Sequence, residues 1–279
     1  MIKSYKINLI GGNMIYKNNK KNFKFNKNNT YVVIDFDKTI TSYESTDSWA
    51  ASANPSIVDS RLMKEMDKLY EKYRPIEMDY NISKEEKLKA MEIWYSECMD
   101  LYYKYNLTKE QMQKSIQNSN VKFRSGAKEL LQLLHNENIP VIVLSAGIGN
   151  TIKQFLKDNR CLFDTMYIIS NFIEFDENGK VKKFDNSKMI HTLNKTIKGH
   201  LPMEFEEKIK EREYKILIGD LIEDIKMVDE NERDTTLRIG ILNEEMENKE
   251  NLKLYQENFD IVVTEDENLE EIIEKLIKI

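Results

Sequence analysis

The sequence predicts an α/β fold: a Rossmann-like, doubly wound parallel sheet with an inserted α-helical cap domain and a small β-hairpin. Three observations indicate it. Six short runs are almost continuously apolar, as strands buried on both faces are. Amphipathic helical patterns separate most of these runs, and alternating strands and helices are typical of parallel sheets. After the first run, about 85 residues contain no strand pattern, which is too long for an ordinary crossover.

The elements follow in chain order. The expected strands are 31–35, 141–145, 166–170, 215–219, 237–242 and 260–263. The expected helices between and after them are 126–138, 151–159, 187–195, 222–232 and 268–277. The first of these helices carries four leucines on one side and stops before Pro140, which cannot continue a helix. At 172–184 the residues Asp176 to Gly179 form a turn between two alternating arms, so a β-hairpin is expected there.

The long insertion has a helical pattern of its own. Helices are expected at 56–73, 84–105 and 108–118, and the second has apolar residues at steps of three and four. We therefore expect three parts. They are a basic Asn- and Lys-rich arm at 1–29, a catalytic core formed by 30–45 and 120–279, and a helical cap at 46–119.

Composition excludes several classes of protein. The apolar fraction of 41% is enough for a buried core, and no run of 18 apolar residues exists to span a membrane. The first residues lack the pattern of a secretion signal, so we expect a cytoplasmic protein, and we expect a monomer. Two cysteines and three scattered histidines argue against a disulfide framework or a zinc site. If the protein is an enzyme, we therefore expect its chemistry to rest on carboxylates, lysines and hydroxyls.

The net charge of −6 is unevenly distributed. Residues 1–29 carry seven lysines and no acidic residue, so the rest of the chain is more acidic than the sum indicates. A basic arm can bind nucleic acid, but a solvated tail is the commoner role of such a run. We expect no nucleic-acid partner.

Two carboxylates lie at the end of the first expected strand, whose last residue is Asp35. Asp35 and Asp37 flank Phe36, and Thr39 comes two residues later. In open α/β sheets ligands bind outside the carboxyl ends of the strands, so both carboxylates face one crevice. Two close carboxylates repel each other unless a cation or a shared proton relieves them, and a hard divalent ion is the natural partner. The alternative is a solvated turn in which these residues only cap the next element.

Similar groups lie at the end of one later strand and directly after another. Ser145 precedes Ala146 and a glycine-containing turn into a helix, where a hydroxyl and backbone N–H groups suit a phosphate. Asp220 follows the strand at 215–219, with Asp224 four residues later. Acids converging at one sheet edge favour a Mg²⁺ site. Lys195 is a further cation able to reach a phosphate oxygen, although most lysines are solvated. Simple turns and an N-cap are the alternative roles for these residues.

The order D-x-D-x-T, Ser, Lys, then G-D-x-x-x-D resembles the haloacid dehalogenase-like phosphohydrolase superfamily. The match narrows to the cytosolic 5′-nucleotidase III (pyrimidine 5′-nucleotidase) family, and it runs from about Tyr31 to the C-terminus. The segments that carry it are 73–79, 85–87, 92–95, 145–149, 170–172, 175–176, 190–191, 194–195, 217–220 and 240–243.

The resemblance implies a Mg²⁺-dependent phosphatase acting on nucleoside 5′-monophosphates of pyrimidine or 7-methylguanosine type. Asp35 would be the nucleophile that forms an aspartyl-phosphate, and Asp37 the general acid and base. Mg²⁺ would bind Asp35, the Asp37 carbonyl and Asp220. The remaining roles are phosphate binding by Ser145, Ala146 and Lys195, nucleobase contact by Glu77 and Cys98, and orientation of the ligands by Thr39 and Asp224.

Two departures from the family matter. Leu221 to Glu223 replace the small polar residues that commonly follow the metal-binding aspartate, and Cys98 stands where animal members have a serine. The base preference of those members is therefore not transferred. Most of the aromatic stripe in the insertion, including Trp94 and Tyr102, is expected to pack in a core.

Alternatives stay open at this point. A related phosphatase of phosphoserine or a sugar phosphate would share the same core motifs. A signalling receiver also has acids, a hydroxyl and a lysine at its strand ends, but it needs no cap of about 85 residues. A nucleic-acid binder would work through residues 1–29.

Overall fold

The computed structural model describes residues 5–8, 14–17, 24–79, 81–243, 249–264, 269–270 and 273. Within these residues one sheet has the strand order β1-β2-β8-β7-β6-β3-β4-β5. Its strands are β1 (Tyr5–Asn8), β2 (Met14–Lys17), β3 (Thr30–Ile34), β4 (Val141–Ile148), β5 (Met166–Asn171), β6 (Tyr214–Gly219), β7 (Thr236–Leu242) and β8 (Ile261–Thr264). Strands β3 to β8 pair in parallel, so the predicted fold class is confirmed.

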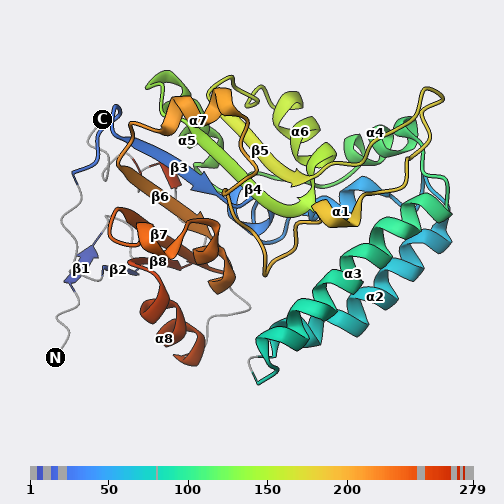
Figure 1. Ribbon diagram of the computed structural model, residues 1–279, viewed down its shortest axis with the longest axis horizontal. Coiled ribbons are helices and arrows are strands. Elements are labelled where there is room, and N and C mark those ends of the chain that lie inside the picture. Colours follow the sequence, from blue (N-terminus) through green and yellow to red (C-terminus); the bar gives the residue numbers. More distant parts are fainter. Residues whose placement is uncertain are drawn as a thin grey trace.

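Helices cover both faces of this sheet (Figure 1). They include α5 (Ala127–Asn136), α6 (Gly149–Asp158), α7 (Met203–Ile209) and α8 (Lys249–Asn258). Alternate residues of β3 enter different cores: Val32 packs with leucines of α5, and Val33 packs with aromatic residues of α7 and α8. Both valines are fully buried, which explains why the strand is apolar without alternation.

The strand order changes direction at β3, which has β4 on one side and β6 on the other. The carboxyl ends of these three strands leave a crevice at such a switch point, and ligands of doubly wound sheets bind there. In Figure 1 the arrowheads of β3 and β4 point toward α1 (Ser48–Ser52), the first helix of the insertion.

The insertion contains α2 (Ser60–Met78), α3 (Lys84–Lys104) and α4 (Lys109–Gln117) after α1. In Figure 1 the helices α2 and α3 form a long pair beside the carboxyl ends of the strands. A capping box of Ser83 and Glu86 begins α3, and Thr108 with Gln111 does the same for α4. These helices have their own apolar core. The division into a core and a cap at 46–119 stays a prediction.

The expected helix at 187–195 is wrong. Only a 3-10 turn at Asn186–Lys188 forms, and the residues after it follow an irregular path. Side chains there bind the backbone in place of a helical carbonyl, since Asn194 Oδ1 accepts from the His191 N–H at 2.7 Å and His191 Nδ1 accepts from the Leu193 N–H at 3.2 Å. Such local hydrogen bonds compete with a helix.

The expected helix at 222–232 is also wrong, because two short 3-10 turns, Ile222–Met227 and Glu230–Glu232, replace it. Asp224 accepts from the Leu221 N–H at 3.0 Å, which tightens the first of them. The expected hairpin at 172–184 is reduced to a turn closed by one bridge, Phe175 to Val181, with Gly179 at φ +73°.

The basic arm does more than form a solvated tail. Strands β1 and β2 pair with each other in antiparallel fashion, and β2 joins the edge of β8. A free strand edge offers unpaired N–H and C=O groups, which explains why a β-rich segment adds there. The expected helix at 268–277 falls mostly outside the described residues. In the described part of the chain no helix is long and apolar enough to cross a membrane.

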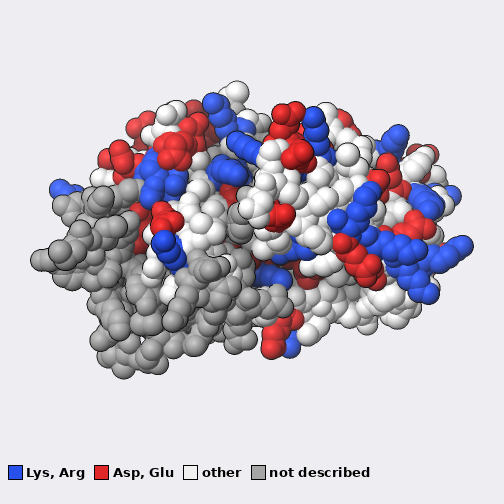
Figure 2. Space-filling view, turned by 90° about the horizontal axis from the view of Figure 1, so that it is seen from below, with Lys and Arg blue, Asp and Glu red and all other residues white. Residues whose placement is uncertain are grey.

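Surface charge is mixed at one end of the molecule. Figure 2 shows Lys and Arg side chains gathering toward the end of the molecule that α2, α3 and α4 occupy. Acidic side chains alternate with them in ion pairs such as Arg61–Asp59, Lys104–Glu65 and Lys114–Glu110. This face therefore carries no continuous field of one sign.

Candidate active site

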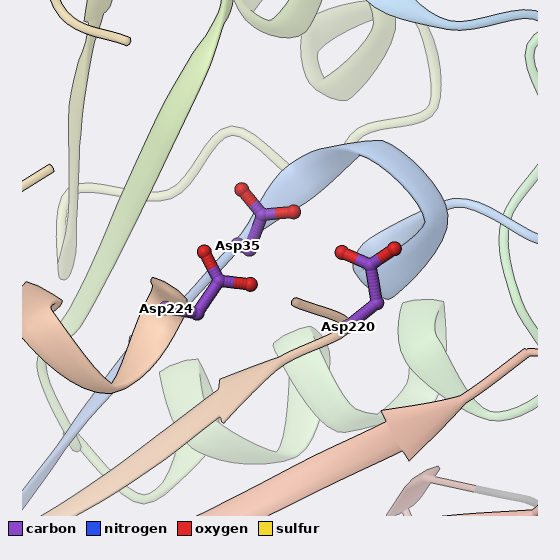
Figure 3. A group of neighbouring side chains, drawn as sticks. All are labelled: Asp35, Asp220 and Asp224. Atoms are coloured by element: carbon purple, nitrogen blue, oxygen red, sulfur yellow. The ribbon is translucent and has the colours of Figure 1, made fainter. Parts of the chain in front are cut away.

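Three carboxylates meet at the crevice. Asp35 follows β3 directly, Asp220 follows β6, and Asp224 lies in the turn after it. Figure 3 shows their side chains turned toward one another. One oxygen of each lies within 4.8 Å of the others, and all three residues are buried. The sequence placed these residues at one sheet edge, and the structure brings them into one group.

Lys195 lies among these carboxylates. Its Nζ is 2.5 Å from Asp35 Oδ1 and 2.7 Å from Asp224 Oδ1. Burial disfavours the charged ammonium, but the charges of Asp224 and Asp35 outweigh that penalty, so the pKa of Lys195 is raised. An ammonium has three N–H donors, of which these two contacts use two. One donor remains for a further anion.

The three carboxylates of this group lie near a single positive side chain, that of Lys195. Burial raises the pKa of Asp35 to about 6, although Lys195 opposes the shift. Burial together with the charges of Asp35 and Asp224 holds the pKa of Asp220 well above its usual range. Three buried carboxylates share one ammonium, which is the situation that a divalent cation with oxygen ligands relieves. The residues therefore fit a metal ion.

Hydrogen bonds from two neighbouring side chains orient the carboxylate of Asp220. Thr39 Oγ1 donates to Asp220 Oδ1 at 3.4 Å, and Asn243 Nδ2 donates to Oδ2 at 3.3 Å. The buried Arg124 donates to Asn243 Oδ1 at 2.7 Å and to the Lys38 carbonyl at 2.8 Å. Sequence reasoning gave no role to Arg124 or Asn243. Asn243 comes just after β7, so its place at the same sheet edge was the available signal.

Asp37 contacts Ser48 at the start of α1. Asp37 Oδ1 accepts from the Ser48 N–H at 2.8 Å, and its Oδ2 lies 2.5 Å from Ser48 Oγ. The same hydroxyl accepts from the Ile148 N–H at 3.2 Å, so its proton points to Asp37. Burial, followed by the charge of Asp47, raises the pKa of Asp37 to about 7. This value suits a group that exchanges protons at neutral pH. Sequence reasoning missed Ser48.

Ser145 and Ala146 lie where β4 leaves its register with β5, between Leu144 and Ile148. Ser145 Oγ accepts from the Gly147 N–H at 3.0 Å. Gly147 also lies against Asp37 and Ser48: a Cβ there would be 2.7 Å from Asp37 Oδ2 and 1.9 Å from Ser48 Oγ. Only glycine allows this approach.

We expect Gly147→Ala to lower the turnover of the phosphatase reaction that the resemblance implies by about 10²-fold. The added methyl group would displace Asp37 and Ser48 by an ångström or more. Gly179→Ala is the control, since its φ of +73° makes alanine strained but its site is remote from the crevice. That variant should lose about 1 kcal/mol of stability and keep its turnover. Equal turnover of both variants in steady-state kinetics would contradict the prediction.

A cavity of about 370 Å³ lies in the insertion next to the crevice. Aromatic side chains form much of its wall, and Trp49 Nε1 donates to the Ala146 carbonyl at 3.2 Å, which connects it with β4. The lining residues are Asp47, Trp49, Ala50, Met63, Met66, Asp67, Tyr70, Arg74, Glu77, Trp94, Tyr95, Cys98, Tyr102 and Thr192. Trp94 and Tyr102 are buried and belong to the core of the insertion while they also face the cavity.

Glu77 and Cys98 both line this cavity, and their contact with a nucleobase stays a prediction. Glu77 is buried, pairs with Arg74 and accepts from Thr192 Oγ1 at 2.8 Å. Burial raises the pKa of the Cys98 thiol to about 12, so this side chain is neutral. Sequence reasoning missed Arg74 and Thr192.

Comparison with known proteins decides the family. The model of the pyrimidine 5′-nucleotidase (UMPH-1) family matches residues 14–279. The chain belongs to this family. The predicted resemblance is therefore confirmed. The match begins at residue 14 and not near Tyr31 as expected, so it includes β2 of the arm and leaves β1 outside.

Relatives within the pyrimidine 5′-nucleotidase family share most of their length with this chain. The rat 7-methylguanosine phosphate-specific 5′-nucleotidase is 30% identical over 245 residues, which is 86% of this chain and 81% of the relative. A Caenorhabditis elegans protein named putative cytosolic 5′-nucleotidase 3 is 31% identical over 260 residues, 90% of this chain and 69% of the relative.

Solved structures agree on the fold. Cytosolic 5′-nucleotidase IIIB bound to cytidine matches with a TM-score of 0.77 and 26% identity, covering 91% of this chain and 86% of that one. A substrate-bound phosphoserine phosphatase matches with a TM-score of 0.54 and 21% identity, over 91% and 99%. This pyrimidine 5′-nucleotidase family member thus has the haloacid dehalogenase-like phosphatase fold.

Proposed function

We propose that the chain is a Mg²⁺-dependent 5′-nucleotidase that releases phosphate from nucleoside 5′-monophosphates. The observation that carries the proposal is the position of Asp35. This buried carboxylate contacts Lys195 and stands beside Asp220 and Asp224. The aromatic cavity, large enough for a nucleoside, is joined to the same sheet edge through Trp49 and Ala146. Family membership supports the same activity.

In the first step an Asp35 oxygen attacks the phosphorus atom in line with the bond to the ribose oxygen. The P–O bond to ribose breaks, an aspartyl-phosphate forms, and Asp37 gives its proton to the departing ribose oxygen. In the second step Asp37 takes a proton from water, whose oxygen attacks the phosphorus. Inorganic phosphate then leaves and Asp35 is restored. The raised pKa of Asp37, about 7, suits both directions of proton transfer.

The negative oxygens of the phosphate need positive partners. Lys195 has one N–H donor beyond its contacts with Asp35 and Asp224, and this donor is available to a phosphate oxygen. The Ser145 hydroxyl and the Ala146 N–H are the other proposed donors, and they stabilise charge that develops in the transition state.

Asp35, Asp220 and the Asp37 carbonyl would hold Mg²⁺. Thr39 would support this set through Asp220. Asp224 lies close enough to be a ligand itself, but its two oxygens accept from Lys195 and the Leu221 N–H, so we assign it to positioning. When bound, the ion supplies charge that screens the attack of an anionic carboxylate on an anionic phosphate.

The direct test is phosphate release from CMP, UMP, AMP, GMP, 7-methyl-GMP and phosphoserine, each with Mg²⁺ and with EDTA. Turnover of at least one nucleotide above that of phosphoserine, lost in EDTA, is the expected result. Turnover of phosphoserine alone, or turnover indifferent to EDTA, would reject the proposal.

Glu77→Gln tests the proposed contact with the nucleobase. A carboxylate accepts hydrogen bonds from a base amine, and an amide presents an N–H in its place, so we expect kcat/KM for nucleotides to fall about tenfold or more. Hydrolysis of p-nitrophenyl phosphate, which has no base, should be unchanged. Glu92→Gln, at an exposed position of α3, is the matched control. An equal loss with both substrates would point to a structural role for Glu77.

A further inference from the structure

The cavity wall carries an ion pair between Glu77 and Arg74, a residue to which the family resemblance gave no role. Arg74 and Glu77 lie one turn apart on α2, and the Arg74 guanidinium donates to Glu77 Oε2. The Glu77 side chain is 7% exposed and that of Arg74 30% exposed, and both face the cavity. The carboxylate therefore meets a ligand with a cation already beside it.

The other oxygen of Glu77 is also held. Thr192, from the irregular segment that carries Lys195, donates to Oε1 at 2.8 Å. The buried Lys87 donates to the Glu77 backbone carbonyl at 2.8 Å, which puts a second cation close to this residue. Asp47 and Asp67 line the cavity as well, but both are exposed, so water screens their charges more than those of the buried residues. The buried end of the cavity has no excess of negative charge.

The pair offers both kinds of hydrogen-bonding group side by side. Each Glu77 oxygen keeps a free lone pair that accepts from a ring N–H or an exocyclic amine. Arg74 has further N–H donors that match a ring carbonyl or an unprotonated ring nitrogen. A neutral base with a donor next to an acceptor, such as cytosine, satisfies both groups. A base with a positive ring gains little from a neutralised carboxylate and is repelled by the guanidinium.

We propose that Arg74 is a specificity-determining residue that makes this cavity select a neutral nucleobase, with an acceptor beside an N–H donor, over the cationic 7-methylguanine. The inference rests on the proposed 5′-nucleotidase function and names the substrate class of the same site. This base preference would distinguish the chain from relatives named for 7-methylguanosine phosphate, such as the rat protein that is 30% identical to it.

The test compares kcat/KM for CMP and 7-methyl-GMP at slightly acidic pH, where the methylated ring keeps its N1 proton and its charge. The wild type should prefer CMP. Arg74→Met removes the charge at similar length and should shift the CMP to 7-methyl-GMP ratio toward 7-methyl-GMP by about tenfold or more. Arg74→Lys keeps the charge and should keep most of the preference. Lys68→Met, at an exposed position of α2, is the control and should leave the ratio unchanged.

The outcomes separate the two proposals. A ratio that does not move in Arg74→Met, or a wild type that prefers 7-methyl-GMP, overturns the inference while nucleotide turnover upholds the proposed function. Hydrolysis of p-nitrophenyl phosphate without hydrolysis of any nucleotide rejects the proposed function instead. If Arg74→Met does not fold, Arg74→Gln and calorimetric binding of cytidine and 7-methylguanosine give the same comparison. A purely structural role would weaken both nucleosides equally.

Discussion

Asp35→Asn is expected to reduce phosphate release from nucleotides by about 10³-fold or more, because the amide cannot form the aspartyl-phosphate. The substitution keeps the shape of the side chain and removes one of the charges that raise the pKa of Asp220, so the protein should remain folded. In an acid-quenched single-turnover experiment with a nucleotide labelled in its phosphate group, the wild-type protein should carry the label and the variant should carry none.

Asp158→Asn, at an exposed position of α6, is the matched control and should keep full turnover. Labelled protein in the Asp35→Asn variant, or turnover within about tenfold of wild type, would mean that another residue is the nucleophile.

Asp220→Asn is expected to remove the effect of Mg²⁺ and, at the same time, to stabilise the metal-free protein at neutral pH. The raised pKa values of Asp35, Asp37 and Asp220 mean that the folded state holds protons that the unfolded chain has released. The contribution of these three groups to metal-free stability is therefore highest below the unfolded pKa of about 4 and falls as pH rises toward the raised values, about 6 and 7 for Asp35 and Asp37.

An asparagine at position 220 carries no charge at any pH, so the gain in free energy of unfolding over wild type should grow from pH 5 to pH 7.5, to about 1–3 kcal/mol. Denaturant unfolding in EDTA at the two pH values measures it. Addition of Mg²⁺ should raise the stability of the wild type and leave Asp220→Asn unchanged. A wild type that is equally stable with and without Mg²⁺ would contradict the assigned metal site.

The strand ends account for what could be predicted of the site. A parallel strand reads as a short apolar run, so the residue that follows it is visible in the sequence, as with Asp35 and Asp220. Parallel strands end at the same edge, so these residues must lie near one another. The hydrogen bonds that hold these carboxylates and the loops around them cannot be predicted from the strand pattern. Arg124 reaches Asn243 and Lys38 across long stretches of chain, and no local pattern indicates such a partner.

The two helices that were wrongly predicted lie at the site itself. Both sequences have helical spacing of apolar residues, but side chains of His191, Asn194 and Asp224 bind the local backbone instead. The irregular path after Ile190 lets one short segment hold Lys195 against Asp35 and Thr192 against Glu77. In this segment the tertiary contacts of Thr192 and Lys195 outweigh the local helix propensity, and side chains satisfy the backbone groups that a helix would pair.

The sequence by itself determined the six parallel strands, the insertion after the first of them, and the order of acids, hydroxyl and lysine along the chain. These features are local or periodic, so single residues and short runs carry them. The tertiary structure alone decided how many carboxylates share Lys195, what holds Asp220 and Asp37, and that Glu77 faces the cavity already paired with Arg74. Charge balance in a buried site depends on distances between distant segments, and only the folded chain sets those distances.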